Sequence, residues 1–148
     1  LAAALALVSG VRRTVVVVPA RLVAEMTTEW ASLPLPPNFC RVVRRPSDLD
    51  WSVPVLLIAQ EHLRAPVARG ARRTLAHLLR GRVGLAVVDE ADYLANVTSD
   101  QTRAIRRLRA RRWYLLTATP QANYPRDVVP LVTLAGGDGT AASPEGQR

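Results

Sequence analysis

Residues 85–92 read LAVVDEAD and residues 113–120 read WYLLTATP, and the architecture of the chain can be worked out from these two stretches. Each is a short apolar run that ends in polar residues: adjacent carboxylates in the first, two hydroxyls and a proline in the second. Such runs are typical of buried parallel strands, and open α/β sheets bind ligands at the carboxyl ends of their strands. Paired carboxylates at a strand end suit a magnesium-bound nucleotide. The pattern therefore predicts a nucleotide site at one edge of a parallel sheet.

Composition narrows the possible partners. The 148 residues suffice for one domain with a hydrophobic core, and the 20 basic and 12 acidic residues give a net charge of +8. This charge either serves a polyanionic partner such as nucleic acid or forms a solvated arginine surface. Every basic residue is arginine, so a GxxxxGK[ST] phosphate-binding loop, which needs lysine, is excluded within these residues.

Cysteine usage and hydropathy indicate the compartment. Cys40 is the single cysteine, which excludes an internal disulfide and a cysteine zinc site and fits a reducing environment. No apolar run approaches the roughly 18 residues that a membrane span requires. We therefore expect no membrane partner and an intracellular location in a nucleus, cytoplasm or nucleoid, with a viral protein as a further option.

Periodicity predicts strands that alternate with helices. Apolar and β-branched runs predict strands at residues 14–18, 39–43, 53–59, 83–88 and 112–117. Apolar residues at helical spacing predict helices at residues 1–9, 20–31, 69–80 and 100–111, with shorter ones at 60–63 and 126–131. Ser99 or Asp100 is the expected N-cap of helix 100–111. This order predicts a parallel sheet with helices on both faces.

Three segments resemble, in the same order, motifs of the first RecA-like lobe of superfamily 2 helicases, specifically the Swi/Snf-type DNA translocases. They are Pro19 with Leu22, Glu29 and Trp30, then DEADYLANVTS at 89–99, then LTATPQAN at 116–123. A weaker match is the strand 55–58 with Gln60, Glu61 and Leu63 after it. Asp92 replaces the histidine usual in this family, which makes the second motif similar to that of DEAD-box proteins as well.

The resemblance covers roughly residues 5–131 and implies a P-loop NTPase fold that is truncated at its N-terminus. Residues 1–134 are then part of the first lobe, and residues 135–148 are a flexible tail or linker. Since the chain has no lysine, the phosphate-binding loop is expected upstream of Leu1. A second RecA-like lobe is expected downstream of Arg148.

The same resemblance implies a catalytic pair. Asp89 would hold Mg²⁺ through water, and Glu90 would polarise the water that attacks the γ-phosphate of ATP. Phosphoryl transfer needs positioning and charge neutralisation, which suits this pair. Without the resemblance, the two carboxylates could instead complement a helix dipole.

Two further groups of residues take roles from the resemblance. Three residues at or just after the ends of the predicted strands 83–88 and 112–117 would couple the nucleotide state to nucleic-acid binding: Asp92, Thr117 and Thr119. Residues after two other strands would contact the nucleic-acid backbone: Pro19, Ala20, Arg21 and Gln60. Amides at a helix start and an arginine both suit phosphate. The alternatives are that Asp92 caps the short turn and that Arg21 is an ordinary exposed arginine.

The leading hypothesis is an ATP-dependent translocase or helicase that acts on double-stranded DNA, with ATP and Mg²⁺ as cofactors. The isolated chain is expected to hydrolyse no ATP at a useful rate, because the phosphate-gripping lysine is missing. Two alternatives stay open: a non-hydrolysing nucleic-acid-binding or scaffolding domain, and an RNA helicase of the DEAD-box kind.

Overall fold

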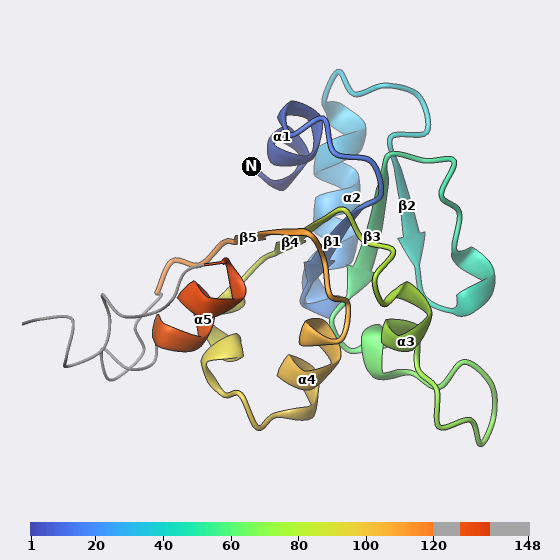
Figure 1. The fold of residues 1–148 in the computed structure, drawn as a ribbon. Helices are drawn as coiled ribbons and strands as arrows, with labels where there is room; N and C mark the ends of the chain where they lie inside the picture. The colour runs from blue at the N-terminus through green and yellow to red at the C-terminus, as the bar shows by residue number, and fades with distance from the viewer. Residues whose placement is uncertain (120–127, 137–148) are drawn as a thin grey trace, which may run out of the picture.

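The computed structural model describes residues 1–119 and 128–136, which form a parallel sheet between two layers of helices (Figure 1). Its strands are β1 (Thr14–Val18), β2 (Cys40–Val43), β3 (Val55–Ala59), β4 (Leu85–Val88) and β5 (Arg112–Leu115). They lie in the order β2-β3-β1-β4-β5, and all neighbouring pairs are parallel. This confirms the predicted α/β class.

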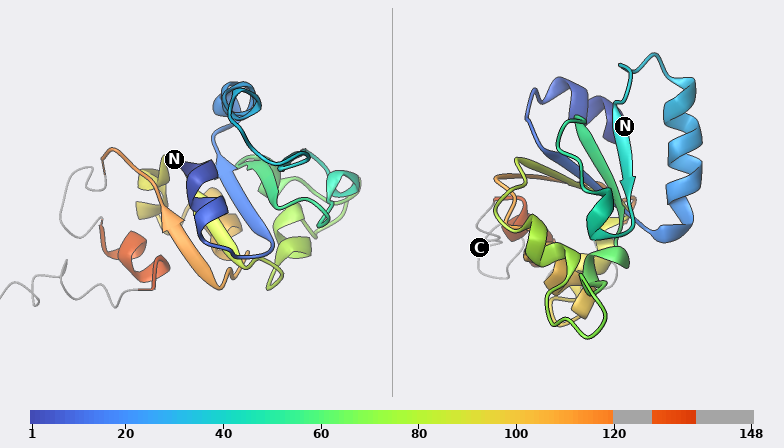
Figure 2. Two further views of the ribbon diagram at one scale, coloured as in Figure 1. Left: turned by 90° about the horizontal axis from the view of Figure 1, so that it is seen from above. Right: turned by 90° about the vertical axis from the view of Figure 1, so that its right-hand side faces the viewer.

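Helices cover both faces of the sheet. They are α1 (Ala2–Val8), α2 (Val23–Ser32), α3 (Leu75–Leu79), α4 (Asp100–Arg106) and α5 (Val129–Leu134), with 3₁₀ turns η1 (Ala20–Leu22), η2 (Pro46–Asp48), η3 (His62–Arg64) and η4 (Ala91–Ala95). Figure 2 shows α1 and α2 on one face, and α3, α4 and α5 on the other. Among the described residues, no helix has the length and apolar character needed to cross a membrane.

The core follows from the alternation of side chains along the central strands. Val15 and Val17 of β1 pack toward α3, α4 and α5, whereas Val16 and Val18 pack toward α1 and α2. All residues of β1, β3 and β4 are buried. Strands that are covered on both faces need apolar residues at every position, which is why these runs are continuously hydrophobic.

The predicted helix 69–80 is wrong in its first half, because α3 begins only at Leu75. Gly70 has a φ of +76°, and Thr74 has an extended backbone at φ −112° and ψ 172°. The Thr74 amide donates to Nδ1 of His77 at 3.0 Å, so these two residues form a capping box that fixes the start of the helix.

The predicted helix 100–111 ends early, at Arg106. Arg109 has a φ of +47°, which is incompatible with a continuing helix. The Arg111 amide then donates to the carbonyl of Val83 at 3.2 Å and leads the chain into β5. The expected N-cap is confirmed as Ser99, whose Oγ accepts from the Thr102 amide at 3.1 Å.

The other predicted elements differ at their ends. Four of the five strands are one or two residues shorter than predicted, and β3 begins after Pro54, which has no amide to donate. The predicted helix 20–31 is divided into η1 and α2, and the predicted short helix 60–63 is the 3₁₀ turn η3. Of the predicted short helix 126–131, only residues 129–131 lie in α5, which continues to Leu134. Residues 126–127 and most of the predicted tail, 137–148, lie outside the described residues.

Candidate functional site

The structure brings the two opening motifs together. β4 pairs with β5 so that Val88 lies beside Leu115, and both strands end at the same level. Backbone hydrogen bonds continue past the strands: the Leu116 amide donates to the Val88 carbonyl, and the Ala91 amide donates to the Leu116 carbonyl, each at 2.8 Å. The acidic loop and the threonine loop are therefore held side by side by main-chain contacts.

A pocket of about 640 Å³ opens between these loops and helices α1 and α2. Its polar lining comes from both motifs: Asp89, Glu90, Asp92, Thr117 and Thr119. The rest of the wall comes from Leu116, Ala118, the first two residues of the chain, and Met26, Glu29 and Trp30 of α2. The spacing of apolar residues along α2 predicts that Met26 and Trp30 face inward. It does not predict that the helix forms one wall of this pocket.

The backbone at the acidic pair is unusual. Glu90 has a left-handed conformation with a φ of 49° and a ψ of 48°. For a residue with a side chain this costs of the order of 1–3 kcal/mol and persists only where the surroundings enforce it. The Asp89 amide donates to the Val17 carbonyl at 2.9 Å, and the Glu90 amide donates to Oδ1 of Asp89 at 3.0 Å. These bonds fix the turn that presents both carboxylates at the end of β4.

Arg21 contacts one carboxylate of this pair, Glu90, from beyond the end of β1. Its guanidinium forms an ion pair with Oε2 of Glu90. The side chains are 68% and 42% exposed, so a solute could compete for either partner. The expected nucleic-acid contact and the expected catalytic residue thus touch each other, which sequence reasoning missed.

The other predicted nucleic-acid contacts also meet at the ends of β1 and β3. Pro19 is buried, and the Ala20 amide donates to Oε2 of Glu61 at 3.2 Å. The Gln60 amide donates to the Val18 carbonyl at 2.8 Å, and Gln60 Oε1 is buried without a hydrogen-bond partner among the described residues. The carboxylate of Glu61 therefore accepts the hydrogen bond of the Ala20 amide, which was expected to bind a phosphate.

The coupling residues lie in one pocket but are not directly bonded. Asp92, Thr117 and Thr119 all line it, yet within the described part of the chain no hydrogen bond joins Asp92 to either threonine. The Thr119 amide donates instead to Oγ1 of Thr117 at 3.1 Å, which closes the threonine loop on itself. Their coupling role stays a prediction. The Pro120 and Asn123 of this motif lie outside the described residues.

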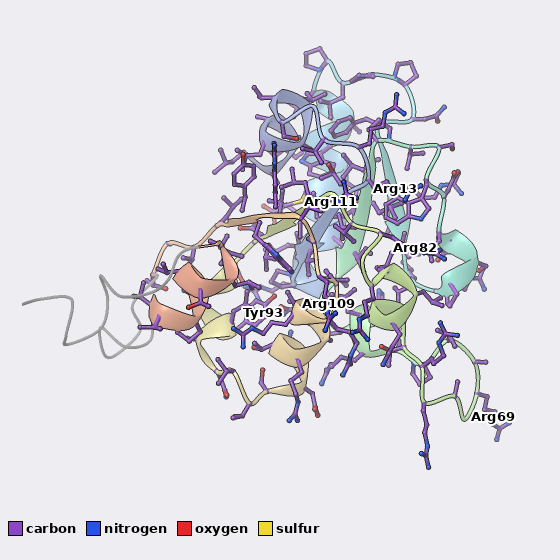
Figure 3. All side chains as sticks on the ribbon, viewed as in Figure 1. Arg13, Arg69, Arg82, Tyr93, Arg109 and Arg111 are labelled. Atoms are coloured by element: carbon purple, nitrogen blue, oxygen red, sulfur yellow. The ribbon has the colours of Figure 1, made fainter. Side chains whose placement is uncertain are left out.

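Tyr93, which sequence reasoning also missed, lies in η4 shortly after the acidic pair and packs against the core (Figure 3). Its hydroxyl is buried without a hydrogen-bond partner in the described residues. Burial raises the pKa of Tyr93, and the negative charges of Glu61, Asp92, Asp89 and Glu90 raise it further. The tyrosine therefore stays protonated and remains a hydrogen-bond donor near the acidic groups.

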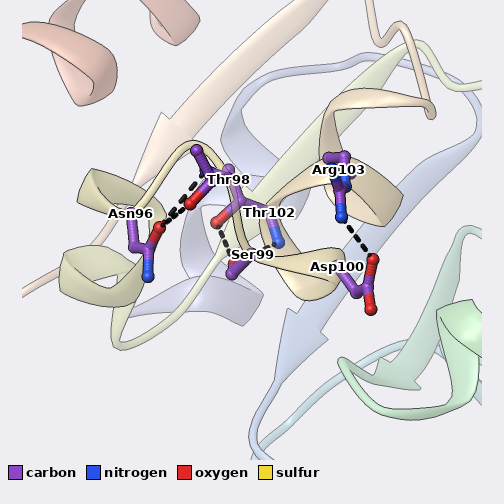
Figure 4. Close-up of polar contacts among 6 residues, drawn as sticks. All are labelled: Asn96, Thr98, Ser99, Asp100, Thr102 and Arg103. Atoms are coloured by element: carbon purple, nitrogen blue, oxygen red, sulfur yellow. Dashed lines mark hydrogen bonds and ion pairs between the residues drawn. The ribbon is translucent and has the colours of Figure 1, made fainter.

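The end of the second motif, residues 96–99, organises the start of α4 (Figure 4). Oδ1 of Asn96 accepts from the amide and the hydroxyl of Thr98, at 3.2 and 2.8 Å. Ser99 Oγ donates to Thr102 Oγ1 at 2.9 Å, in addition to capping the Thr102 amide. Asn96 and Ser99 therefore have a structural role: they stabilise the loop that joins the acidic motif to α4.

The donor set fits the predicted magnesium-nucleotide. A magnesium ion bound with a nucleotide takes most of its ligands from water and phosphate, and needs only one or two carboxylates. Asp89 fits that role through water, while Glu90 and the hydroxyls of Thr117 and Thr119 surround the remaining space. Among the described residues, there is no group of three or more His, Cys, Asp or Glu side chains placed to hold a metal ion.

Comparison with known proteins identifies a matching family and a similar solved structure. The SNF2-related domain matches residues 8–139. Among solved structures, the chain is similar to the Sulfolobus solfataricus SWI2/SNF2 ATPase core in complex with dsDNA, with a TM-score of 0.70 and 19% sequence identity. The match covers 95% of this chain and 28% of that one, and it confirms the predicted RecA-like fold. No curated protein matches the chain.

Proposed function

Because the chain belongs to the SNF2-related domain family, we propose that it forms part of a motor that couples ATP hydrolysis to movement along double-stranded DNA. One observation carries this proposal: the acidic pair of β4 and the hydroxyls after β5 line one pocket at the carboxyl edge of the sheet. A solved relative of the same fold, the SWI2/SNF2 ATPase core, was obtained in complex with dsDNA.

In the proposed reaction, Glu90 takes a proton from the water that attacks the γ-phosphorus of ATP, and the bond from that phosphorus to the ADP leaving group breaks. Asp89 would hold the magnesium ion through water. The ion would neutralise charge on the phosphates. The bond from the Glu90 amide orients the Asp89 carboxylate, and the left-handed backbone at Glu90 sets the direction in which its side chain leaves the chain. Pre-set orientation of this kind is the main contribution that a protein makes to phosphoryl transfer.

The chain supplies the water-activating side of the site and lacks the phosphate-gripping lysine. We propose that this lysine and a second RecA-like lobe belong to the same motor, and that the lobes close on the nucleotide. Asp92, Thr117 and Thr119 would then sense its state. Arg21 and Gln60 would contact the nucleic-acid backbone near the same edge, with Pro19 and Ala20 beside them.

ATP hydrolysis by the intact protein tests this function. We expect phosphate release to increase on addition of duplex DNA, and to respond less to single-stranded DNA or RNA. Stimulation by RNA alone would favour the DEAD-box-like alternative. Nucleic-acid binding without any hydrolysis would favour the non-hydrolysing binding or scaffolding domain.

A further inference from the structure

A second, basic pocket lies between α3 and α4, apart from the nucleotide pocket. It has a volume of about 310 Å³, and its lining includes three arginines, which we call the arginine pocket: Arg64, Arg103 and Arg107. Arg64 ends η3, and both α3 and α4 pack against η3. Arg103 of α4 and Arg107, the C-cap residue of this helix, are four residues apart. They therefore lie on one face of the helix, roughly 5–6 Å apart at their Cβ atoms.

The charge in this pocket is mostly uncompensated. Asp100 is its one acidic lining residue, and Oδ1 of Asp100 accepts from Arg103 at 2.7 Å. This bond lowers the pKa of Asp100, and the nearby charge of Arg64 contributes. Within the described residues, neither Arg64 nor Arg107 lies within ion-pair distance of a carboxylate. The pocket therefore carries an excess of two positive charges.

More positive charge flanks the pocket on the α3 side. Partial burial lowers the pKa of His77, and so do the charges of Arg107, Arg73 and Arg80. Nδ1 of His77 is engaged with Thr74, itself a lining residue. Arginines of η3, of α4 and of the segments that flank α3 thus lie near one another. If these arginines only kept a helix surface soluble, they would not need to come together from separate segments.

We propose that the arginine pocket binds phosphates of a nucleic-acid backbone. The position favours this ligand, because η3 begins two residues after Gln60, at the strand end where backbone contacts are expected. Because Arg64 ends η3 and lines the arginine pocket, a nucleic acid bound at this strand end would lie next to the pocket. Arginine forks and threonine hydroxyls are the groups that proteins use for phosphate. This inference rests on the proposed function, since it extends that nucleic-acid path.

The test uses the intact protein and a 30-base-pair DNA duplex, with affinity measured across a series of salt concentrations. Each phosphate contact contributes about 0.9 to the slope of log affinity against log salt. We expect Arg64→Gln with Arg107→Gln to reduce that slope by nearly two. The double variant Arg64→Lys with Arg107→Lys preserves the charge and should keep most of the slope. A folded lysine variant with a normal slope shows that the loss in the glutamine variant comes from the charge and not from a folding defect.

The matched control is Arg82→Gln with Arg111→Gln, which removes the same charge before β4 and β5 (Figure 3). An unchanged slope in the pocket variant, or an equal loss in the control, overturns the inference. If the pocket variant keeps the wild-type slope while DNA still stimulates ATP hydrolysis, the arginine pocket is not a phosphate site but the proposed motor function is supported. If the slope falls as expected but the intact protein hydrolyses no ATP, the pocket stands and the motor function fails.

Discussion

The guanidinium of Arg21 lies against the carboxylate of Glu90, although 68 residues separate them in the sequence. The contact exists because β1 and β4 are parallel neighbours whose ends lie at one level, with Val17 beside Val88. In the proposed motor, one partner faces the nucleic-acid backbone and the other activates water. Nucleic-acid phosphate that draws Arg21 away would therefore leave Glu90 free to accept a proton.

Replacing Arg21 with glutamine should raise ATP hydrolysis in the absence of DNA. An exposed ion pair contributes about 0.2–1 kcal/mol, so release of Glu90 should increase the basal rate by at most about fivefold. The same substitution should weaken DNA binding and lower the salt slope by about one, because a phosphate contact is lost. Steady-state phosphate release and duplex titrations of the intact protein measure both effects. Arg21→Lys keeps the charge and should resemble the wild type; an unchanged basal rate in Arg21→Gln would mean that the pair does not restrain Glu90.

Replacing Glu90 with glutamine should abolish turnover while ATP and DNA still bind. Loss of a general base typically costs 10²–10⁴-fold in rate, whereas the amide preserves the size of the side chain. Phosphate release should fall by about this factor, and nucleotide and duplex affinities should change little. Glu25→Gln, on the exposed side of α2 outside the pocket, is the matched control and should hydrolyse ATP normally. Normal turnover in Glu90→Gln would remove this residue from the proposed role.

The sequence predicts the central strands well because their signal is local. β1 begins and ends at the predicted residues, since a β-branched run is bounded by Arg13 and Pro19. The pattern predicts helix α3 too long because arginines carry little periodic signal, and its fully buried residues are confined to Leu75, Ala76 and Leu79. Its true start depends on the Thr74 cap, which needs a specific backbone conformation.

The site is predicted in its motifs but not in its side-chain pairs. Parallel topology alone places the ends of β4 and β5 together, so the shared pocket follows from the sequence. The Ala20–Glu61 bond and the Arg21–Glu90 pair do not, because neighbouring loops allow several partners and rotamers choose among them. Long-range polar pairing of this kind carries no spacing signal.

Gly84 should not tolerate alanine. A Cβ atom there would lie 2.3 Å from the Arg12 carbonyl oxygen and 2.7 Å from Cγ1 of Val11. The backbone must shift to relieve the first contact, and overpacking of this kind costs about 1–3 kcal/mol. Urea unfolding should show a lower midpoint with an unchanged slope. The double variant Val11→Ala with Gly84→Ala should recover little, because the carbonyl remains; full recovery would show that only the valine contact matters.

Ser99→Ala should lower the free energy of unfolding by about 1 kcal/mol, because the Thr102 amide loses its cap. Ser99→Asp keeps an acceptor at the N-cap and should retain most of the stability. Thermal or urea unfolding followed by circular dichroism compares the two. Equal losses in both variants would indicate that the Ser99 hydroxyl acts by donating to Thr102 Oγ1 rather than by capping.

Cys40 should be a slow nucleophile at neutral and mildly alkaline pH. Burial on β2 raises the pKa of its thiol from 9.0 to about 11, so the folded protein holds the proton through a range in which the unfolded chain loses it. Unfolding therefore releases a proton between about pH 9 and 11, and this contribution to stability is intact below pH 9 and declines as the pH rises through that window.

Two measurements check the Cys40 prediction. Iodoacetamide at pH 8.5 should alkylate the native protein at least tenfold more slowly than the urea-unfolded protein, because only the thiolate reacts. The difference in unfolding free energy between the wild type and Cys40→Ala should shrink from pH 9 to pH 11. Since both proteins share every other titrating group, the difference isolates the thiol. Equal alkylation rates for the native and unfolded protein at pH 8.5 would show that the fold neither shields the Cys40 thiol nor raises its pKa.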